Sequence, residues 1–509
     1  MTGTSMHPIR VFVRWATTQR KSVSIIGSGP SGFYTACRLL SKSPIPLDVT
    51  LWEKLPVPFG LSRYGVAPDH PEVKNCEQTF TEYARKYLYP GVDGHTFRFR
   101  GNVTIGKDLE LNTLMKRQDA VILSYGCSGD HKLGIPGEDD TKGVFTSREI
   151  VNWYNGHPDF AKSEKLNGFD WESVRKVGII GNGNVALDLA RVLLSCREND
   201  IWAHTDINPF ALSAFRRAPI QEVKLIARRD FVHSKFTNKE YRELWELEQY
   251  GIRGFISDQY FDASKIDLTN ADRVQKRRVE MTSEYLKPFN ERTKKNYRKF
   301  PPPAAGFKKH WEMDYLKTPL RINSGADGKL KSLTVCPNIL SADSKIEPLA
   351  YEEIDYDMDV LITSLGYGSS PLVDFPSLNI GFAKNHVYND RGMVLNTQGS
   401  IIPGLYVSGW IKKGSSGVIA STMADAFEVA DMVITDLRSV ASSKSRAIDI
   451  SGVRFTTWKD WEKIDLEEKA RGKFQNKIRD KFIDTNDILA FLREEIPSSI
   501  EDGSHIGPL

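Results

Sequence analysis

The hydrophobic pattern near the start of the chain predicts a strand, a glycine-rich turn and a helix, in that order. Residues 22–40 read SVSIIGSGPSGFYTACRLL, in which β-branched residues precede the glycines and hydrophobic residues recur at helical spacing after them. A second predicted strand, LDVTLWEK, reaches Glu53, 26 residues after Gly27. This order is typical of a dinucleotide-binding βαβ unit, in which an acidic residue about 20 residues after the glycines binds a ribose.

The same pattern recurs in the middle of the chain. Residues 174–194, VRKVGIIGNGNVALDLARVLL, again predict strand, glycine turn and helix, and the strand EVKLIARR then ends at Arg229. The long stretch between them, 196–221, is expected to form additional helical surface rather than a third domain. Two nucleotide sites in one chain are therefore predicted.

The last third of the chain indicates a return to the first domain. After the predicted strand MDVLITSLGYG, residues 404–437 predict a strand, a glycine-rich turn and a long helix. Because this pattern follows the second nucleotide unit, we expect the first domain to be discontinuous.

The composition mainly argues against certain classes of protein and site. The chain has 509 residues, enough for two or three domains, and its 40% hydrophobic and 26% charged residues are typical of a globular protein. It contains no run of 18 apolar residues, which argues against a membrane-spanning helix and leaves peripheral attachment open. Its five cysteines are scattered without a CxxC pair, which argues against a disulfide scaffold, a zinc site or a cluster site.

The N-terminus has its own composition. Residues 1–21 contain Arg10, Arg14, Arg20 and Lys21, and the first acidic residue of the chain is Asp48. This pattern favours a mitochondrial transit peptide over 1–21, and the alternative is a frayed basic N-terminus.

The first glycine motif, Gly27-Ser28-Gly29-Pro30-Ser31-Gly32, suits a pyrophosphate. In such motifs the first glycine permits the tight turn, the second lets the backbone approach the pyrophosphate, and the third lets the helix pack on the strand. The N-terminus of the helix then attracts the negative charge. Glu53 is expected to accept hydrogen bonds from a ribose diol.

The second glycine motif differs from the first in a way that favours NADP(H) over NAD(H). Gly181-Asn182-Gly183-Asn184-Val185-Ala186 has alanine at the third glycine position, and its second strand ends in Arg228-Arg229 rather than in an acid. Two guanidinium groups would bind the 2′-phosphate of NADP(H), which a carboxylate would repel. The alternative is a solvated arginine pair.

A flavin dinucleotide site and a nicotinamide dinucleotide site in one chain suit hydride transfer. We predict an α/β protein with two Rossmann-like dinucleotide-binding domains, a glutathione-reductase-like two-domain flavoprotein. The expected boundaries are 22–130 and 379–509, with a C-terminal tail, for the discontinuous FAD-binding domain and 131–378 for the NADPH-binding domain.

At this point the chain resembles a known family, the adrenodoxin-reductase type of NADPH:ferredoxin reductases found in mitochondria. The resemblance covers nearly the whole chain from Ser22. It is carried by EKLPVPFGLSRYGVAPDHPEVKN at 53–75, GNVTIGKDL at 101–109, GIPGEDDTKGVF at 134–145, GNGNVALDLAR at 181–191, ARRDFVHSKFTNKEYREL at 227–244 and GWIKKGSSGVIASTM at 409–423. The chain departs from the mammalian form at Ser31 and Ser415-Ser416, and both changes are small enough for a glycine-rich loop.

The resemblance implies site residues by position. It implies FAD contacts at Ser31, Glu53, Leu61, Ile105, Trp410, Gly417, Val418 and Ile419, beside Gly27, Gly29 and Gly32 of the first turn. It implies NADPH contacts at Asn182, Gly183, Asn184, Val185, Arg228, Arg229, Glu240 and Gly417, beside Gly181. His70 and Asp188 resemble the family's polar pair near the flavin ring, with roles in positioning cofactors and moving protons.

The implied activity is hydride transfer from NADPH to FAD, then single electrons to a [2Fe-2S] ferredoxin that serves iron–sulfur cluster, heme or steroid-type pathways. Ferredoxins of this kind are acidic, and the segment 271–310 contains twelve basic residues and only four acidic ones. Within it we expect a basic docking surface formed by Arg273, Lys276, Arg277 and Arg278. The resemblance also implies the mitochondrial matrix and peripheral association with the inner membrane. No nucleic-acid partner is expected.

Three alternatives remain to be weighed. A disulfide reductase also joins FAD and NADPH domains, but it needs a redox cysteine pair, and no two cysteines here lie near each other in sequence. A flavin-dependent monooxygenase shares both glycine motifs, and a non-catalytic dinucleotide-binding protein shares the fold.

Overall fold

The structure is a computed structural model that describes residues 20–269, 271–341, 345–440, 444 and 447–495. It divides into two compact units. Unit 1 comprises the described residues of Met1–Val57, Gln78–Gly126 and Pro371–Trp458, and unit 2 those of Pro58–Glu77, Cys127–Ser370 and Lys459–Leu509.

Unit 1 is built on a seven-stranded sheet with the order β19-β20-β21-β4-β1-β2-β3. Its strands are β1 (Lys21–Ile26), β2 (Leu47–Trp52), β3 (Thr96–Arg100), β4 (Ala120–Leu123), β19 (Asn389–Asp390), β20 (Met393–Leu395) and β21 (Ile401–Val407). The strands from β21 to β3 pair in parallel, and β19 and β20 form an antiparallel edge. The order therefore reverses between β1 and β4, the place where open α/β sheets bind ligands.

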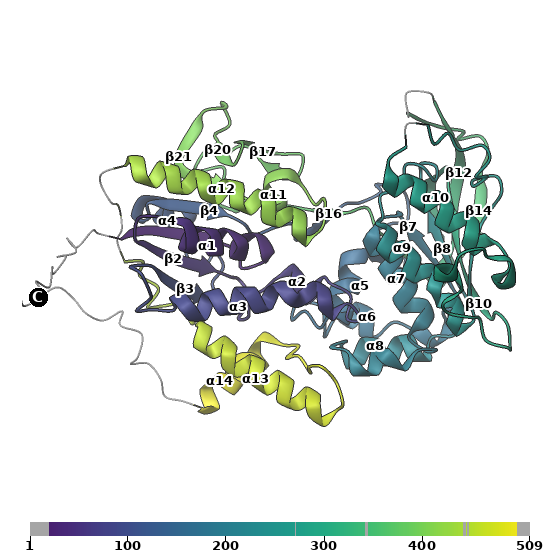
Figure 1. The fold of residues 1–509 in the computed structure, drawn as a ribbon, viewed down its shortest axis with the longest axis horizontal. Coiled ribbons are helices and arrows are strands. Elements are labelled where there is room, and N and C mark those ends of the chain that lie inside the picture. Colours follow the sequence, from purple (N-terminus) through teal and green to yellow (C-terminus); the bar gives the residue numbers. More distant parts are fainter. Residues whose placement is uncertain (1–19, 270, 342–344, 441–443, 445–446, 496–509) are drawn as a thin grey trace, which may run out of the picture. The chain divides into compact units, whose positions relative to one another are not determined.

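The helices of this unit are α1 (Pro30–Lys42), most of α3 (Cys76–Tyr87), α4 (Leu111–Arg117), α11 (Trp410–Lys413) and α12 (Ile419–Ser439), and β17 (Phe382–Ala383) pairs with β18 (His386–Val387). Helices α1 and α12 lie side by side (Figure 1). Tyr34 contacts the ring of Phe427, and one turn further along both helices Arg38 binds Asp431 at 2.7 Å. The two helices therefore run in the same direction, so their N-termini lie at the same end.

Unit 2 contains a six-stranded sheet in which every pairing is parallel, with the order β6-β15-β7-β8-β10-β9. Its strands are β6 (Val144–Thr146), β7 (Lys176–Ile180), β8 (Glu222–Ile226), β9 (Ile252–Ile256), β10 (Lys309–Asp314) and β15 (Val360–Thr363). The helices around it include α5 (Ser147–Tyr154), α6 (Glu164–Asn167), α7 (Asn184–Ser195), α8 (Pro209–Arg217), α9 (Asn238–Trp245) and α10 (Arg273–Leu286). Both predicted dinucleotide folds are thus confirmed.

Smaller elements complete unit 2. A four-stranded antiparallel sheet contains β11 (Lys317–Ser324), β12 (Leu330–Leu340), β13 (Ile346–Pro348) and β14 (Ile354–Asp357), and β5 (Gly129–Asp130) pairs with β16 (Tyr367–Gly368). The 3₁₀ helices are η1 (Pro71–Asn75), η2 (Trp171–Ser173), η3 (Asp200–His204), η4 (Glu246–Tyr250), η5 (Phe289–Glu291) and η6 (Lys295–Arg298). The stretch 196–221 forms η3 and α8, as predicted, and buries Trp202 and Phe215.

The C-terminal tail packs within unit 2. Its helices α13 (Trp458–Phe474) and α14 (Thr485–Glu495) belong with the segment 58–77, which contains α2 (Leu61–Tyr64) and η1. Arg63 of α2 binds Glu468 of α13 at 2.5 Å, and both side chains are almost fully buried. The compact units differ from the expected boundaries 22–130, 131–378 and 379–509 at these two segments, which buried ion pairs join to unit 2. They also differ at 127–130, which lies in unit 2, and at 371–378, which lies in unit 1. Which cofactor each domain binds remains a prediction.

The N-terminal prediction lies mostly outside the described residues, because the structure describes only Arg20 and Lys21 of 1–21. Lys21 is the first residue of β1, and its ammonium group donates to the carbonyl of Val440 at 2.9 Å. The ordered strand thus begins one residue before Ser22. Among the described helices, none is both long and apolar enough to cross a membrane.

Candidate functional site

The first glycine turn joins β1 to α1 in unit 1, and packing accounts for two of its glycines. Gly27 has φ +101°, and a Cβ there would come within 2.6 Å of the carbonyl oxygen of Ser124, which follows β4. A Cβ on Gly32 would lie 2.0 Å from the carbonyl oxygen of Gly27. The close approach of helix and strand therefore excludes any side chain at either position.

Gly29 differs from its two neighbours. It is the N-cap of α1 with φ −72°, and a Cβ there would meet no described atom within 4 Å. No side chain caps the helix, so its first amides have no side-chain acceptor. An open space in front of free helix amides fits a pyrophosphate.

A second helix end lies at the same end of unit 1. Val418 is the N-cap of α12 without a side-chain cap bond, Gly417 has φ +79°, and Val418 is 48% exposed. Because α12 runs parallel to α1, the positive ends of both helices lie at one edge of the unit. The predicted residues Gly417, Val418 and Ile419 are thus placed at an anion-attracting helix terminus.

Glu53 follows β2 and is held rigidly. Its Oε2 accepts hydrogen bonds from the amide of Ser28 at 2.9 Å and the hydroxyl of Ser28 at 2.8 Å, and its Oε1 accepts one from the amide of Leu55 at 3.1 Å. The carboxylate is therefore fixed beside the glycine turn, and its remaining lone pairs can accept from a ribose. Nearby, the hydroxyl of Ser124 is buried and has no hydrogen-bond partner among the described residues, so it is an orphaned polar group of the kind that a bound ligand satisfies.

The segment around Trp410 packs against the first glycine turn. Gly409 has φ +76°, and a Cβ on it would lie 2.6 Å from the hydroxyl of Ser31, which itself bonds to Ser408 at 2.8 Å. The indole of Trp410 donates to the carbonyl of Ser416 at 3.2 Å, which holds the 410–417 loop closed. Ile105 is buried in the core of this same unit.

Leu61 lies in unit 2, as the first residue of α2. Its contact with FAD, like the contact of Gly417 with NADPH, stays a prediction.

The second glycine turn, between β7 and α7 in unit 2, repeats the geometry of the first. Gly181 has φ +122°, and a Cβ on it would lie 2.2 Å from the carbonyl oxygen of Ser364, which follows β15. Gly183 is the uncapped N-cap of α7, and a Cβ there would meet no described atom within 4 Å. Both units thus hold their glycine turn at the point where the strand order reverses, with open space at the middle glycine.

Neighbouring residues secure this turn. The side-chain amide of Asn182 donates to the hydroxyl of Ser234 at 3.1 Å, and the side-chain oxygen of Asn184 accepts from the backbone amide of Thr237 at 2.8 Å. Val185 packs partly buried against the core, and Ala186 is fully buried. The alanine at the third glycine position therefore fills space between helix and sheet.

Arg228 and Arg229 follow β8 and are exposed. Within the part of the chain that the structure describes, neither guanidinium group forms a hydrogen bond or an ion pair. Glu240 of α9 has a buried carboxylate oxygen, Oε2, without a hydrogen-bond partner among these residues. Unpaired cations beside an open glycine turn fit a phosphorylated dinucleotide.

His70 and Asp188 belong to a polar cluster in unit 2. The Nε2 atom of His70 lies 2.8 Å from a carboxylate oxygen of Glu243, and Asp188 accepts from Arg191 at 2.7 Å. Arg191 also pairs with Asp69. The cluster therefore joins the 58–77 segment to α7 and α9.

The electrostatics of this cluster favour a charged histidine. Burial alone would lower the pKa of His70, but the adjacent carboxylate of Glu243 and the charge of Asp188 raise it above its ordinary value. Burial raises the pKa of Asp188 to about 7, against the effect of His70. Strongly shifted groups in one cluster are typical of functional sites.

Comparisons with known proteins now decide the family. A model of the NAD(P)-binding Rossmann-like domain matches residues 25–88. The chain is 62% identical to the probable mitochondrial NADPH:adrenodoxin oxidoreductase of Saccharomyces cerevisiae, over 91% of this chain and 95% of that protein. The chain belongs to the NADPH:adrenodoxin oxidoreductase family. The human mitochondrial member is 35% identical over 94% of each chain.

A solved structure agrees with this family. FprA from Mycobacterium tuberculosis matches with a TM-score of 0.78 and 29% identity, over 93% of this chain and 99% of that chain, and it has also been solved in complex with NADPH. The resemblance found in the sequence is thus confirmed.

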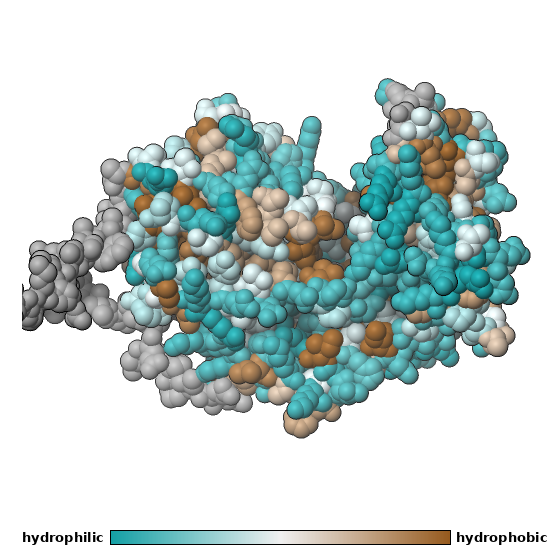
Figure 2. Space-filling view, viewed as in Figure 1, coloured by the Kyte–Doolittle hydropathy of each residue, from teal (hydrophilic) through white to brown (hydrophobic). Residues whose placement is uncertain are grey.

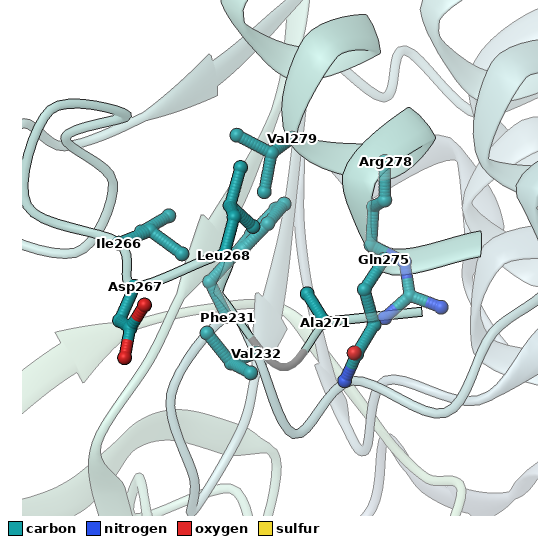
Figure 3. Close-up of a pocket in the computed structure, with 9 residues that line it drawn as sticks. All are labelled: Phe231, Val232, Ile266, Asp267, Leu268, Ala271, Gln275, Arg278 and Val279. Atoms are coloured by element: carbon teal, nitrogen blue, oxygen red, sulfur yellow. The ribbon is translucent and has the colours of Figure 1, made fainter. Parts of the chain in front are cut away.

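One residue of the predicted docking surface on this family member was wrongly assigned. Arg278 is only 6% exposed, and its guanidinium donates to the carbonyls of Ser234 at 2.8 Å and Phe236 at 2.9 Å. It lines a pocket of about 170 Å³ between α10, residues 231–232, residues 266–268 and Ala271 (Figure 3). Helical periodicity turns Arg278 inward, whereas Arg273, Lys276 and Arg277 of the same helix are exposed.

Sequence reasoning missed Glu243, Arg191 and Asp69 in the cluster around His70. Arg191 follows Asp188 by one helical turn on α7, a spacing that favours an ion pair. Glu243 likewise follows Glu240 by one turn on α9, so helical spacing could have placed it on the same face. No local pattern indicated Asp69.

Proposed function

We propose that this chain is an FAD-containing NADPH:ferredoxin oxidoreductase of the adrenodoxin type. It accepts hydride from NADPH and delivers single electrons to a [2Fe-2S] ferredoxin. The observation that carries the proposal is the pair of dinucleotide sites with opposite charge beside the ribose position. Buried Glu53 lies at the first site, and the unpaired Arg228 and Arg229 lie at the second. The printed names of the relatives support both the nucleotide and the class of acceptor.

In unit 1, the chain would hold FAD through backbone and carboxylate groups. The free amides at the start of α1 face the space left by Gly29, which suits the pyrophosphate, and Glu53 suits a ribose diol. The uncapped start of α12 at Val418 offers a second set of positive amides. When bound, FAD supplies the ability to take two electrons together and release them singly.

In unit 2, the chain would also hold NADPH through helix amides, but with arginines in place of the ribose-binding acid. The amides at the start of α7 face the space left by Gly183, and Arg228 and Arg229 bind the 2′-phosphate. Glu240 offers its unpartnered carboxylate oxygen to the nucleotide. These residues select NADPH over NADH by charge rather than by shape.

His70 and Asp188 would position cofactors and exchange protons. Hydride transfer and electron release need no covalent nucleophile, so neither residue has to attack a substrate. The raised pKa of His70 favours its charged form, which suits a proton-exchanging group.

An acidic ferredoxin would dock on the exposed cations of α10, Arg273, Lys276 and Arg277. Complementary charges steer encounter between electron-transfer partners, and salt weakens the steering. The buried Arg278 instead holds α10 against the 234–236 segment, because its guanidinium group donates to the carbonyls of Ser234 and Phe236.

We place the protein in the mitochondrial matrix, in line with the relatives named mitochondrial, and in peripheral contact with an anionic membrane. The stretch 469–479 contains five basic residues and no acid. Within it, Phe474 is 93% exposed and Ile478 56% exposed, and Lys473 and Lys477 form no ion pair with the described residues. Elsewhere the surface is mostly hydrophilic with small separate hydrophobic patches on the face shown (Figure 2). Exposed apolar residues among lysines suit anionic headgroups.

The membrane proposal has a direct test. Phe474→Ser with Ile478→Ser, and Lys473→Glu with Lys477→Glu, should each abolish sedimentation with phosphatidylglycerol vesicles, and the wild type should ignore phosphatidylcholine vesicles. Tyr351→Ser, at a residue that is 80% exposed on another surface, serves as the control. Unchanged sedimentation of both double variants would exclude this stretch as the contact.

The experiment for the main proposal is NADPH-dependent cytochrome c reduction by the purified flavoprotein, with and without a [2Fe-2S] ferredoxin. We expect a flavin absorption spectrum and a rate that depends on the ferredoxin. A monooxygenase would instead consume NADPH and O₂ in response to an organic substrate, and a non-catalytic protein would oxidise no NADPH. Either result would overturn the proposal.

A further inference from the structure

The backbone that carries Arg228 and Arg229 is held by the chain that passes beside it at the start of β11. The amide of Lys317 donates to the carbonyl of Ala227 at 3.0 Å, and the amide of Leu316 donates to the carbonyl of Arg229 at 3.4 Å. Between these two bonds lies the carbonyl of Arg228, to which no backbone amide of the described residues donates. This carbonyl therefore needs a donor from a side chain.

Asn338 of β12 supplies that donor. Its side-chain Nδ2 donates to the carbonyl of Arg228 at 2.9 Å, and its Oδ1 accepts from the hydroxyl of Thr318 at 2.8 Å. A carbonyl only accepts hydrogen bonds, so the nitrogen of the amide has to face Arg228 and the oxygen has to face Thr318. Because Asn338 is only 6% exposed, water has little access to either bond.

The main chain of Asn338 is anchored as well. Its amide donates to the carbonyl of Leu316 at 2.8 Å, and Leu316 is the residue that donates to Arg229. The guanidinium groups of Arg228 and Arg229, in contrast, are exposed and form no bond with the described residues. Where the guanidinium of Arg228 can reach is thus set by its backbone, because nothing else holds the side chain.

We propose that Asn338 is a positioning residue for recognition of the 2′-phosphate of NADPH. By holding the carbonyl of Arg228, it fixes the point from which that side chain extends toward the phosphate. The inference rests on the proposed function, and it extends the nucleotide site to the small antiparallel sheet of unit 2. A guanidinium–phosphate contact depends on orientation, whereas a nucleotide without the 2′-phosphate offers Arg228 nothing to orient against.

Three variants separate this role from general support of the fold. Asn338→Ala removes the donor to Arg228, and Thr318→Val removes only the hydroxyl that orients the Asn338 amide. Asn323→Ala is the matched control, because Asn323 lies on β11 of the same sheet and its side-chain amide donates to Ser332 at 3.0 Å and to Thr334 at 2.8 Å.

The test is calorimetric titration of the oxidised flavoenzyme with 2′,5′-ADP and with ADP, which differ only in the 2′-phosphate. We expect Asn338→Ala to weaken binding of 2′,5′-ADP roughly fivefold and to leave binding of ADP within about twofold. Thr318→Val should cause a smaller loss in the same direction, and Asn323→Ala should leave both affinities as in the wild type. Thermal unfolding of each variant measures any loss of stability separately.

A double-mutant cycle identifies the residue through which Asn338 acts. In an Arg228→Gln background, Asn338→Ala should be nearly silent toward 2′,5′-ADP, because coupled residues are not additive. An undiminished loss in that background would overturn the proposal, and so would equal weakening of 2′,5′-ADP and ADP by Asn338→Ala.

The same titrations distinguish failure of this inference from failure of the proposed function. A wild type that binds 2′,5′-ADP no better than ADP would overturn the NADPH site and the role of Asn338 together. A wild-type preference that Asn338→Ala retains in full would overturn the role of Asn338 alone. If Asn338→Ala reduces the preference while the protein reduces no ferredoxin, the proposed function fails and the role of Asn338 stands.

Discussion

Three glycines in one short turn meet different physical constraints. Gly27 and Gly32 cannot carry a side chain, because a Cβ atom would lie 2.6 Å and 2.0 Å, respectively, from a backbone oxygen. Gly29 has an ordinary φ of −72° and open space in front of it. The first two thus serve folding, and we propose that the third leaves room for the pyrophosphate of FAD.

We therefore expect opposite outcomes from two alanine substitutions. Gly29→Ala should fold with the melting temperature of the wild-type apoprotein but bind FAD at least tenfold more weakly, because the new methyl group occupies the pyrophosphate space. Gly32→Ala should destabilise the apoprotein itself, because its Cβ collides with backbone. Flavin fluorescence titration and thermal unfolding of the apoproteins measure both effects. Normal FAD affinity in Gly29→Ala would contradict the assignment.

We expect Arg228 and Arg229 to give the preference for NADPH over NADH. Replacing both with uncharged residues should raise KM for NADPH at least tenfold and leave the use of NADH nearly unchanged, because only NADPH carries the 2′-phosphate. Steady-state ferricyanide reduction with each nucleotide checks this. Equal losses with NADPH and NADH would show that the arginines do something other than bind the phosphate.

At the scale of elements, the helices that begin at the proposed nucleotide sites share one feature of their first turn. Helices α1, α7 and α12 begin without a side-chain cap, each directly after a glycine-containing turn. Helices α5 and α10 begin instead with complete capping boxes, Thr146 with Glu149 and Asp272 with Gln275. A capped terminus has already satisfied its amides, so the uncapped ones are the better anion sites.

The exposed cations of helix α10 are the proposed docking surface for the ferredoxin. Reversing Lys276 and Arg277 to Glu should severely reduce ferredoxin-dependent cytochrome c reduction and flatten its salt dependence, yet leave ferricyanide reduction intact, because a small acceptor needs no docking surface. Arg175→Glu with Lys331→Glu, at exposed positions on other elements, is the charge-matched control. A normal ferredoxin rate with normal salt dependence would move the docking surface elsewhere.

At the scale of the whole molecule, a buried ion network ties the C-terminal tail to the rest of unit 2. Asp206 accepts from Lys74 at 2.8 Å and from Lys481 at 2.9 Å, and Lys481 also donates to the carbonyls of Arg63 and Asn155. Burial would raise the pKa of Asp206, but the two lysines hold it well below its ordinary range. The tail thus supports the segment that carries His70.

Asp206→Asn should destabilise the protein by about 3–5 kcal/mol at pH 7, because the partly buried Lys74 and the buried Lys481 lose the carboxylate that pairs with both. A carboxyl group with a lowered folded pKa stabilises above its unfolded pKa of about 3.9, and this stabilisation is lost as pH falls through that value and below it. The difference between wild type and variant in denaturant unfolding should therefore shrink with acid. Asp200→Asn, in the same stretch but fully exposed, is the control and should behave as wild type. A pH-independent difference would contradict the ionic explanation.

The sequence by itself determined both glycine turns, the arginine pair and the family, because each is encoded within a short continuous segment whose geometry is local. Tertiary structure alone decided which face of α10 is buried, and hence that Arg278 is unavailable to a partner. It also decided that 58–77 and the C-terminal tail join unit 2, and that Glu243 lies 2.8 Å from His70. These features depend on contacts between segments far apart in the chain, and no local pattern of hydrophobic and polar residues specifies which distant side chain will meet a buried charge.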